Sequence, residues 1–250
     1  MYRSRHADSG TQEAQPHRYA PSAPGVGASR PAVAWLLAGM ALAIMVFLLG
    51  ELAKLGPVAR LDLHADQHIA AQDRTSLLTT LAKAVSTIAT PEIVGVGLMI
   101  VVPVILLLAR RRLDAVKVFC MFAGALALAE VGKKLINEHR PPVSLQAMAA
   151  DSGPSFPSGH ATTAAVLAVA LIVVATTIAW RATALLLGGL YAVTVAVSRV
   201  YLGDHYPLDV LGGMLCALAA AFIVTGLAAL PAVQPYLQRL RLTAPAERHR

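Results

Sequence analysis

The sequence predicts an all-α integral membrane protein with six transmembrane helices. Of its 250 residues, 56% are hydrophobic and only 14% are charged, whereas soluble chains carry about 25% charged residues. The mean hydropathy is +0.62. A spanning helix needs about 20 apolar residues, so the chain is long enough for six. This composition excludes a disordered protein, a secreted disulfide-stabilised domain and, despite the net charge of +7, a nucleic-acid-binding domain.

The first half of the chain divides into a tail, two spans and an amphipathic segment. Residues 1–30 carry arginines among Pro, Ser and Gly and are predicted to form a disordered cytoplasmic tail. The uncharged run Pro31–Gly50 is a first span. Residues 51–90 show apolar side chains at helical spacing, which predicts an amphipathic helix that lies at the membrane interface or packs on the bundle. Ile93–Ala109 is a second span, kinked at Pro103.

The second half contains four further apolar runs and one long polar loop. Ala115–Val131 is a third span that continues as helix through two lysines, and the loop Asn137–Ser158 follows it. The remaining spans are Ala161–Trp180, Ala182–Val197 and Pro207–Leu230, and residues 231–250 form a basic cytoplasmic tail. Residues 31–230 are therefore predicted to be one six-span domain.

The distribution of basic residues predicts the orientation in the membrane. Most of the 21 Lys and Arg residues fall on one side of the predicted spans if the N-terminus lies inside. Cytoplasmic loops carry an excess of Lys and Arg. We therefore expect a protein of the cytoplasmic (inner) membrane with both termini in the cytoplasm, whose opposite ends face the periplasm or the exterior.

Three short stretches place charged residues and histidines at span ends on that outer side. They are Lys133 with Arg140-Pro141, Pro157-Ser158-Gly159-His160, and Ser198-Arg199 with His205 and Asp209. A charged side chain at membrane depth costs about 2.5–3.5 kcal/mol on insertion scales. Several such groups at one level therefore indicate a shared ligand.

The charges of these stretches match a phosphate or diphosphate. Lys133, Arg140 and Arg199 supply three positive charges, and arginine binds the oxygens of such an anion bidentately. Ser158 and Gly159 open the fourth span, where backbone amides have no partner within the helix and favour an anion. These five residues are the predicted phosphate-binding residues.

The two histidines have separate predicted roles in displacement at phosphorus. Asp209 lies four residues after His205 and can accept the Nδ1 proton of His205, which leaves Nε2 as the nucleophile. His160 has no carboxylate at such a spacing, which favours a proton donor to the leaving oxygen. A water then hydrolyses the phosphohistidine. Neither a metal nor a cofactor is required.

These motifs resemble the three signature motifs of the type-2 phosphatidic acid phosphatase superfamily. The matching patterns are Lys133-(x6)-Arg140-Pro141, Pro157-Ser158-Gly159-His160 and Ser198-Arg199-(x5)-His205-(x3)-Asp209. The resemblance covers residues 133–209 directly. It implies a membrane-embedded lipid phosphate phosphatase with the site on the outer face, His205 as nucleophile, His160 as acid, and Asp209 as the partner of His205. Undecaprenyl diphosphate is the favoured substrate, followed by phosphatidic acid and phosphatidylglycerol phosphate.

Several alternatives stay open at this level. A phosphotransferase would use the same site, and an anion transporter would instead place its charges in mid-span. A soluble vanadate-dependent haloperoxidase shares the motifs, but six apolar spans disfavour it.

Individual residues near the motifs also have alternative roles. Lys134 is expected to pair with Glu130, which leaves Lys133 for the phosphate. Ser198 either binds phosphate or caps the fifth span, and His139 could line the mouth of the site. His64 and His68 lie four residues apart and could share a metal, although a solvated helix explains them more simply. The sequence does not indicate an oligomeric state.

Overall fold

The computed structural model describes residues 30–149 and 152–242. The predicted N-terminal tail, apart from Arg30, and the last eight residues of the predicted C-terminal tail lie outside this part of the chain. The described part is helical, which confirms the predicted class. The helices are α1 (Arg30–Ala53), α2 (Gly56–His68), α3 (Ser76–Ile88), α4 (Pro91–Val96), α5 (Val102–Leu108), α6 (Arg112–Ile136), α7 (Gly159–Val174), α8 (Ile178–Tyr201), α9 (Pro207–Ala229) and α10 (Gln234–Leu242).

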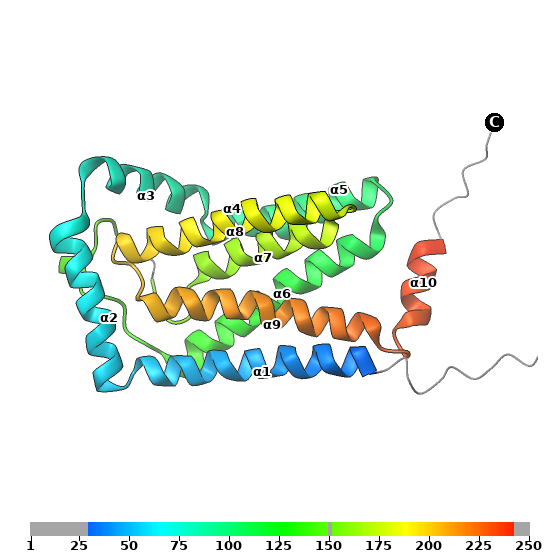
Figure 1. Ribbon diagram of the computed structural model, residues 1–250, viewed down its shortest axis with the longest axis horizontal. Coiled ribbons are helices and arrows are strands. Elements are labelled where there is room, and N and C mark those ends of the chain that lie inside the picture. The colour runs from blue at the N-terminus through cyan, green and yellow to red at the C-terminus, as the bar shows by residue number, and fades with distance from the viewer. Residues whose placement is uncertain (1–29, 150–151, 243–250) are drawn as a thin grey trace, which may run out of the picture.

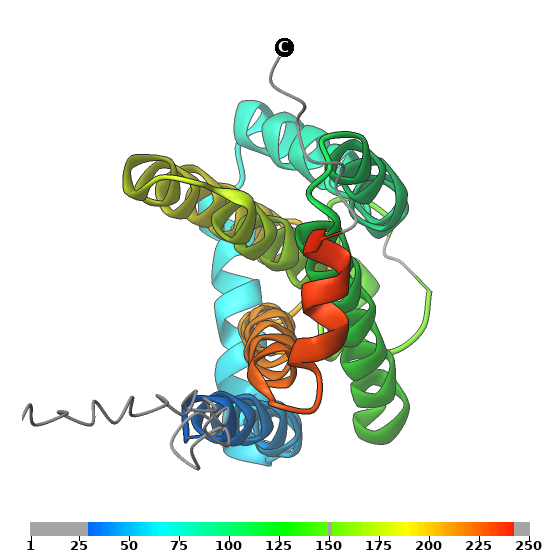
Figure 2. The same cartoon turned by 90° about the vertical axis from the view of Figure 1, so that its right-hand side faces the viewer.

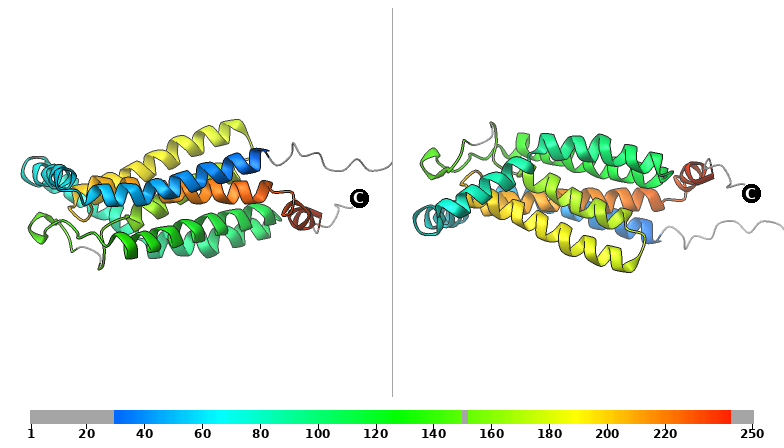
Figure 3. Two further views of the ribbon diagram at one scale, coloured as in Figure 1. Left: turned by 90° about the horizontal axis from the view of Figure 1, so that it is seen from below. Right: turned by 90° about the horizontal axis from the view of Figure 1, so that it is seen from above.

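The long helices run side by side along the long axis of the molecule (Figures 1 and 3). Helix α2 crosses one end of this bundle, which we call the α2 end, and α10 lies at the opposite end (Figure 1). Helix α9 packs against α1, α6 and α7, so it forms the centre of the bundle. The view along the bundle shows α9 between α1 and the other long helices (Figure 2).

Five helical segments of the described residues are long and apolar enough to cross a membrane. They are α1, the continuous segment Ser76–Leu108, α6, α8 and α9. Helix α7 is apolar but has only 16 residues. The prediction of a membrane protein with many apolar spans is therefore confirmed, while the fourth predicted span is shorter than expected.

The predicted boundary between the fourth and fifth spans is wrong. Helix α7 ends at Val174, and Trp180 belongs to the first turn of α8 instead of the end of α7. The reason is a cap: the Thr177 side chain accepts a hydrogen bond from the Trp180 amide, at 3.2 Å. Threonine at this position satisfies a helix-start amide and sets where the helix begins.

The segment that links the first two spans contains two helices instead of one. Helix α2 ends in a π-helical turn, Ile69–Asp73, and Thr75 caps the start of α3. A second π-helical turn, Gly97–Val101, lies just before Pro103. Proline lacks an amide hydrogen and crowds the preceding turn, and π-helical turns accommodate such a disruption within a helix. The irregularity expected at Pro103 therefore takes the form of a π-helical turn.

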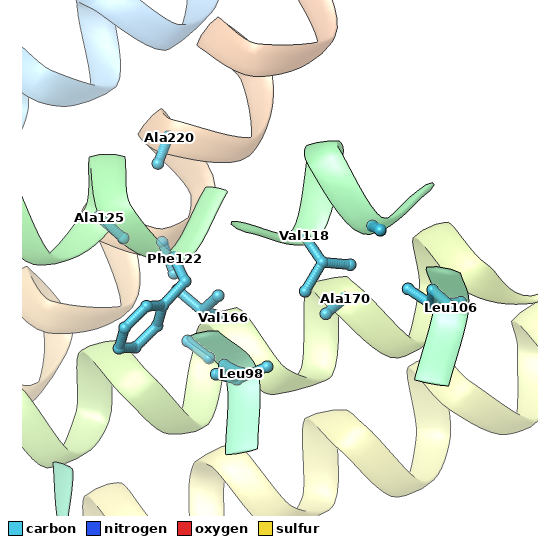
Figure 4. Close-up of a cluster of buried hydrophobic side chains, with 11 residues drawn as sticks. Leu98, Leu106, Val118, Phe122, Ala125, Val166, Ala170 and Ala220 are labelled. Carbon is cyan, nitrogen blue, oxygen red and sulfur yellow. The ribbon is translucent and has the colours of Figure 1, made fainter. Parts of the chain in front are cut away.

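The core is made of small and branched apolar side chains between the long helices. One cluster joins α5, α6, α7 and α9 around Val118, Phe122 and Val166, each at most 3% exposed. The close-up shows Phe122 of α6 beside Val166 of α7 (Figure 4). Phe122 also forms the deep wall of the pocket described below, so the core and the site share this side chain.

Candidate active site

A pocket of about 460 Å³ opens at the α2 end, between α4, α6, α7 and the loop before α9. Its polar part brings together Lys133, Arg140, Gly159, His160 and His205. These residues come from all three sequence motifs, and the pocket places them around one space, as the phosphate hypothesis requires. The remaining lining residues are Pro91, Glu92, Phe122, Leu126, Glu130, Ser152 and Thr163.

Lys133 faces the pocket from the last turns of α6. A Cβ atom built on Gly159 would lie 3.7 Å from Lys133 Nζ, so the ammonium sits against the start of α7. Lys133 also forms an ion pair with Glu130, with Nζ and Oε1 3.1 Å apart. The expected pairing of Glu130 with Lys134 is therefore wrong. A side chain three residues further on is as near as one four residues on, and here it is Lys133 that turns toward Glu130.

Arg140 holds the loop together and contacts His205. Its Nε donates to the Gly153 carbonyl at 3.1 Å, and its Nη1 donates to the Asp204 carbonyl at 3.0 Å. The same Nη1 lies 3.3 Å from His205 Nε2. Because a guanidinium can only donate, this contact requires Nε2 to be the acceptor. The His205 proton is therefore on Nδ1, and Nε2 points toward Arg140, which lines the pocket together with His205.

His205 and Asp209 form the predicted pair. His205 Nδ1 lies 3.3 Å from Asp209 Oδ2, and both side chains are at most 1% exposed. Pro207 begins α9, as expected, and the Tyr206 amide donates to the same Asp209 oxygen at 2.8 Å. The hydrogen bond from the Tyr206 amide at the start of α9 thus holds the Asp209 carboxylate in place beside His205.

The hydroxyl of Ser155 also contacts this pair, and the sequence does not predict this contact. Its Oγ makes a short hydrogen bond to Asp209 Oδ2 and lies 3.3 Å from His205 Nδ1. Ser155 precedes the second motif by two residues. In the sequence it resembles any serine of a polar loop, so no local signal distinguishes it.

Ser158 differs from its predicted role. Its side chain caps α7 by accepting from the Ala161 amide at 3.4 Å, and its own amide donates to the Asp209 carbonyl at 3.0 Å. The Ser158 amide is thus already used, and Ser158 does not line the pocket. Gly159 and His160 occupy the first two positions of α7, where amides have no carbonyl within the helix. The prediction that this helix start meets an anion therefore rests on these two amides instead of on that of Ser158.

Arg199 also lies differently from the prediction. It is buried behind the pocket instead of lining it, with its Nη2 3.0 Å from Asp204 Oδ2. Its Nη1 makes a short hydrogen bond to Ser86 of α3. The sequence does not signal either partner, since Ser86 lies 113 residues away and Asp204 belongs to none of the three motifs. Ser198, the neighbour of Arg199, donates to the Val195 carbonyl at 2.7 Å within α8 instead of capping it.

Close backbone approach brings the second motif against α9. A Cβ on Gly213 would lie 2.5 Å from the Ser158 carbonyl oxygen, and a Cβ on Gly212 would lie 2.6 Å from the Phe156 ring. Only glycine permits such contacts. Phe156 is fully buried beside Gly212 and anchors the loop. The second and third motifs therefore meet because α9 has no side chains where they touch.

Two buried acids, Asp62 and Asp66, and the half-buried Glu138 lie near Asp209. Burial raises the pKa of Glu138 to about 8, that of Asp66 to about 7 and that of Asp62 to about 6. The negative charge of Asp209 raises all three further, while Arg74 opposes the shift at Asp66. Burial with these neighbouring acids also raises the pKa of Tyr206 to about 12. This end of the molecule therefore holds protons on carboxyl groups near neutral pH.

The other histidines noted in the sequence lie away from the pocket. His68 is exposed and lies 3.4 Å from Asp73, measured from Nδ1 to Oδ2. His139 lines a separate shallow pocket next to Arg140. Among residues 30–149 and 152–242, no three His, Cys, Asp or Glu side chains are close enough together to hold a metal ion.

Comparison with known proteins agrees with the geometry. A family model described as the PAP2 superfamily matches residues 114–229, a range that contains all three motifs. This part of the chain is similar to the PAP2 superfamily. The match runs from the start of α6 to the end of α9, so it includes the helices and loops that carry the motif residues of the pocket.

Two curated relatives each match about half of the chain. An undecaprenyl-diphosphatase of Sulfolobus acidocaldarius is 33% identical over 49% of this chain and 59% of its own length. Phosphatidylglycerophosphatase B of Bacillus subtilis is 34% identical over 47% of this chain and 59% of its own length. The chain therefore spans about three fifths of the length of these two relatives.

Two solved structures share the fold. A transmembrane PAP2-type phosphatidylglycerolphosphate phosphatase from Bacillus subtilis superposes with a TM-score of 0.66 at 24% identity, covering 75% of this chain and 94% of that one. LpxE of Aquifex aeolicus superposes with a TM-score of 0.52 at 22% identity, covering 63% of this chain and 91% of that one. The chain therefore has the same fold as these two proteins.

Proposed function

We propose that this protein is a membrane lipid phosphate phosphatase that works through a phosphohistidine intermediate. The observation that carries the proposal is the single pocket that His205 lines beside Lys133, Arg140 and His160, with its Nε2 toward Arg140. Two cations and the amides that start α7 suit a phosphoryl group with several charged oxygens. Buried Arg199 lies behind them, paired with Asp204.

In the proposed reaction, His205 Nε2 attacks phosphorus and His160 protonates the departing oxygen. The bond from nitrogen to phosphorus forms as the bond from phosphorus to the leaving oxygen breaks. Water then attacks the phosphohistidine: its oxygen bonds to phosphorus as the nitrogen–phosphorus bond breaks, and its proton passes to the now neutral His160. Neutral His205 and inorganic phosphate are released. Asp209 keeps the proton on Nδ1 throughout. Cations around the phosphoryl oxygens stabilise the charge that develops in each step.

The pocket shape favours a lipid over a soluble phosphate ester. Its lining continues along α6 from Lys133 to Leu126 and Phe122. At a rise of 1.5 Å per residue, Phe122 lies about 16 Å along the helix axis from Lys133. Helix α6 is one of the helices apolar enough to span a membrane. A phosphate can therefore sit at the polar end while an apolar tail lies along the apolar wall.

The orientation of the helices supports a site on the outer face. The first described residue and α10 lie at the end opposite α2 (Figure 1). That end carries the arginine run 110–112 and also Arg181, which starts the second turn of α8. Basic residues favour the cytoplasmic side. Both termini would then be cytoplasmic, in the cytoplasmic membrane, with the pocket facing the periplasm or exterior.

Among lipid substrates we favour undecaprenyl diphosphate, with phosphatidic acid and phosphatidylglycerol phosphate next. Relatives of comparable similarity are named for the first and the last of these. The polar residues of the pocket contact the phosphoryl group, so they accept any of the three.

The test is phosphate release by the purified protein in detergent from each of these three lipids. We expect wild-type turnover on at least one lipid and its complete loss in His205→Ala. His68→Ala removes an exposed histidine and serves as the matched control with full activity. Retained turnover in His205→Ala would refute the nucleophile. Transfer of labelled phosphate to a lipid acceptor instead of to water would make the protein a phosphotransferase.

A further inference from the structure

Ser155 is placed behind the nucleophile instead of in the substrate pocket. It lies in the loop between Arg140 and α7, its side chain is fully buried, and it does not line the pocket. Its hydroxyl reaches both members of the pair: Oγ makes the short hydrogen bond to Asp209 Oδ2 and lies 3.3 Å from His205 Nδ1. A residue in this position cannot touch a substrate but can control how the histidine is held.

The hydrogen bonds of Asp209 are concentrated on one oxygen. Oδ2 interacts with the Ser155 hydroxyl, the Tyr206 amide at 2.8 Å and His205 Nδ1 at 3.3 Å. Oδ1 is buried and has no hydrogen-bond partner among the described residues. The charged carboxylate therefore depends on very few donors. Ser155 is the donor that a side-chain substitution removes without changing the histidine or the helix start.

The loop that carries Ser155 is fixed on both sides. The Ser155 amide donates to the Glu138 carbonyl at 2.8 Å, and the next residue, Phe156, is fully buried against Gly212. Two residues later the Ser158 amide donates to the Asp209 carbonyl at 3.0 Å. The hydroxyl therefore has a defined position relative to Asp209, which a residue in a loosely held loop would lack.

We propose that Ser155 is a positioning residue of the proposed phosphatase reaction, which holds the Asp209 carboxylate charged and His205 in the attacking orientation. The inference rests on the proposed function. A hydroxyl that donates to a carboxylate stabilises its charged form. Without it, the buried Asp209 carboxylate loses one of its few donors and holds the Nδ1 proton of His205 less firmly. The imidazole then loses both its tautomer control and one of its contacts.

The test compares Ser155→Ala with wild type in lipid phosphate hydrolysis across pH. We expect kcat to fall about tenfold or more, since one hydrogen bond to a charged group is lost, and KM to change less than about twofold because Ser155 does not touch the substrate. The acidic limb of the plot of kcat against pH should move up by about one unit. Ser155→Thr keeps a hydroxyl and should return the acidic limb to its wild-type position.

The matched control is Ser144→Ala, an exposed serine in the turn Val143–Leu145 of the same loop, which should leave kcat and the pH profile unchanged. Wild-type kcat with an unshifted acidic limb in Ser155→Ala would overturn the positioning role alone. Absence of any hydrolysis by the wild type would overturn the proposed function and this inference together. If Ser155→Ala elutes as an aggregate in detergent, Ser155→Cys replaces it in the test. Cysteine is a weaker donor of similar size, so we expect the same shift of the acidic limb.

Discussion

Asp66 gives the sharpest prediction about stability, because its environment opposes its charge. The side chain is fully buried in α2, and neither carboxylate oxygen has a hydrogen-bond partner among the described residues. Burial, followed by the charges of Asp62 and Asp209, raises the pKa of Asp66 from 3.8 to about 7. A difference of about three units corresponds to about 4 kcal/mol between the folded and unfolded states.

The sign follows from which state holds the proton. Between about pH 4 and pH 7 the folded protein keeps the Asp66 proton while the unfolded chain has released it, so the free energy of unfolding falls as the pH rises. The contribution of the neutral Asp66 carboxyl to the free energy of unfolding is at its full value below about pH 4 and is lost once the pH passes about 7. Asp66→Asn has nearly the same shape and no charge. It should therefore unfold at a higher temperature than wild type at pH 8 and at a similar temperature at pH 4.5.

Cys216 provides the assay. It is buried in α9, whereas Cys120 is exposed, so in a Cys120→Ala background a dipyridyl disulfide, which reacts with thiols in acid as well as at pH 8, reports the exposure of Cys216 as the protein unfolds in detergent. Asp73→Asn, which neutralises an exposed carboxylate at the end of the same segment, is the matched control without a gain at pH 8. A lower unfolding temperature for Asp66→Asn at pH 8, or an equal gain at both pH values, would refute the reasoning.

Three further predictions concern the pocket and its support. Vanadate, which resembles five-coordinate phosphorus, should inhibit hydrolysis while EDTA leaves the rate unchanged; loss of turnover on chelation would point to a metal-dependent reaction. Glu130→Gln removes the ion-pair partner of Lys133, so KM should fall by up to about fivefold, as an exposed ion pair is worth up to about 1 kcal/mol; a higher KM in a substrate titration would contradict this. Gly213→Ala forces a Cβ against the Ser158 carbonyl, so it should lower the free energy of unfolding by about 1–3 kcal/mol and also lower kcat in the same assays. Gly189→Ala, with nothing within 4 Å of the added atom, should change neither.

The apolar helices could be predicted because composition acts locally. A run of apolar residues long enough to span a bilayer must bond its backbone internally, and a helix does so within the segment itself. The ends of helices depend on weaker and more variable contacts. The cap by Thr177 moved the start of α8 ahead of the predicted position, and the π-helical turn before Pro103 had no signal beyond the proline itself.

The pocket residues could be predicted only in part. Lys133, Arg140, Gly159, His160 and His205 meet as their motifs indicated. Ser158 and Arg199 instead contact protein groups that lie outside the motifs. The Ser158 side chain accepts from the Ala161 amide, and Arg199 binds Asp204 and Ser86. Their roles in binding phosphate stay predictions.

From the order of residues alone, one can determine a bilayer-embedded helical protein and the kinds of groups that would meet a phosphate, because hydropathy and residue type are properties of the chain itself. Only the tertiary structure decided that Ser155 supports Asp209 across 54 residues and that α2 buries acids behind the nucleophile. The reason is that a hydrogen bond depends on the distance between two atoms within a few tenths of an ångström. Residues that are far apart along the chain reach such distances only when the helices have packed.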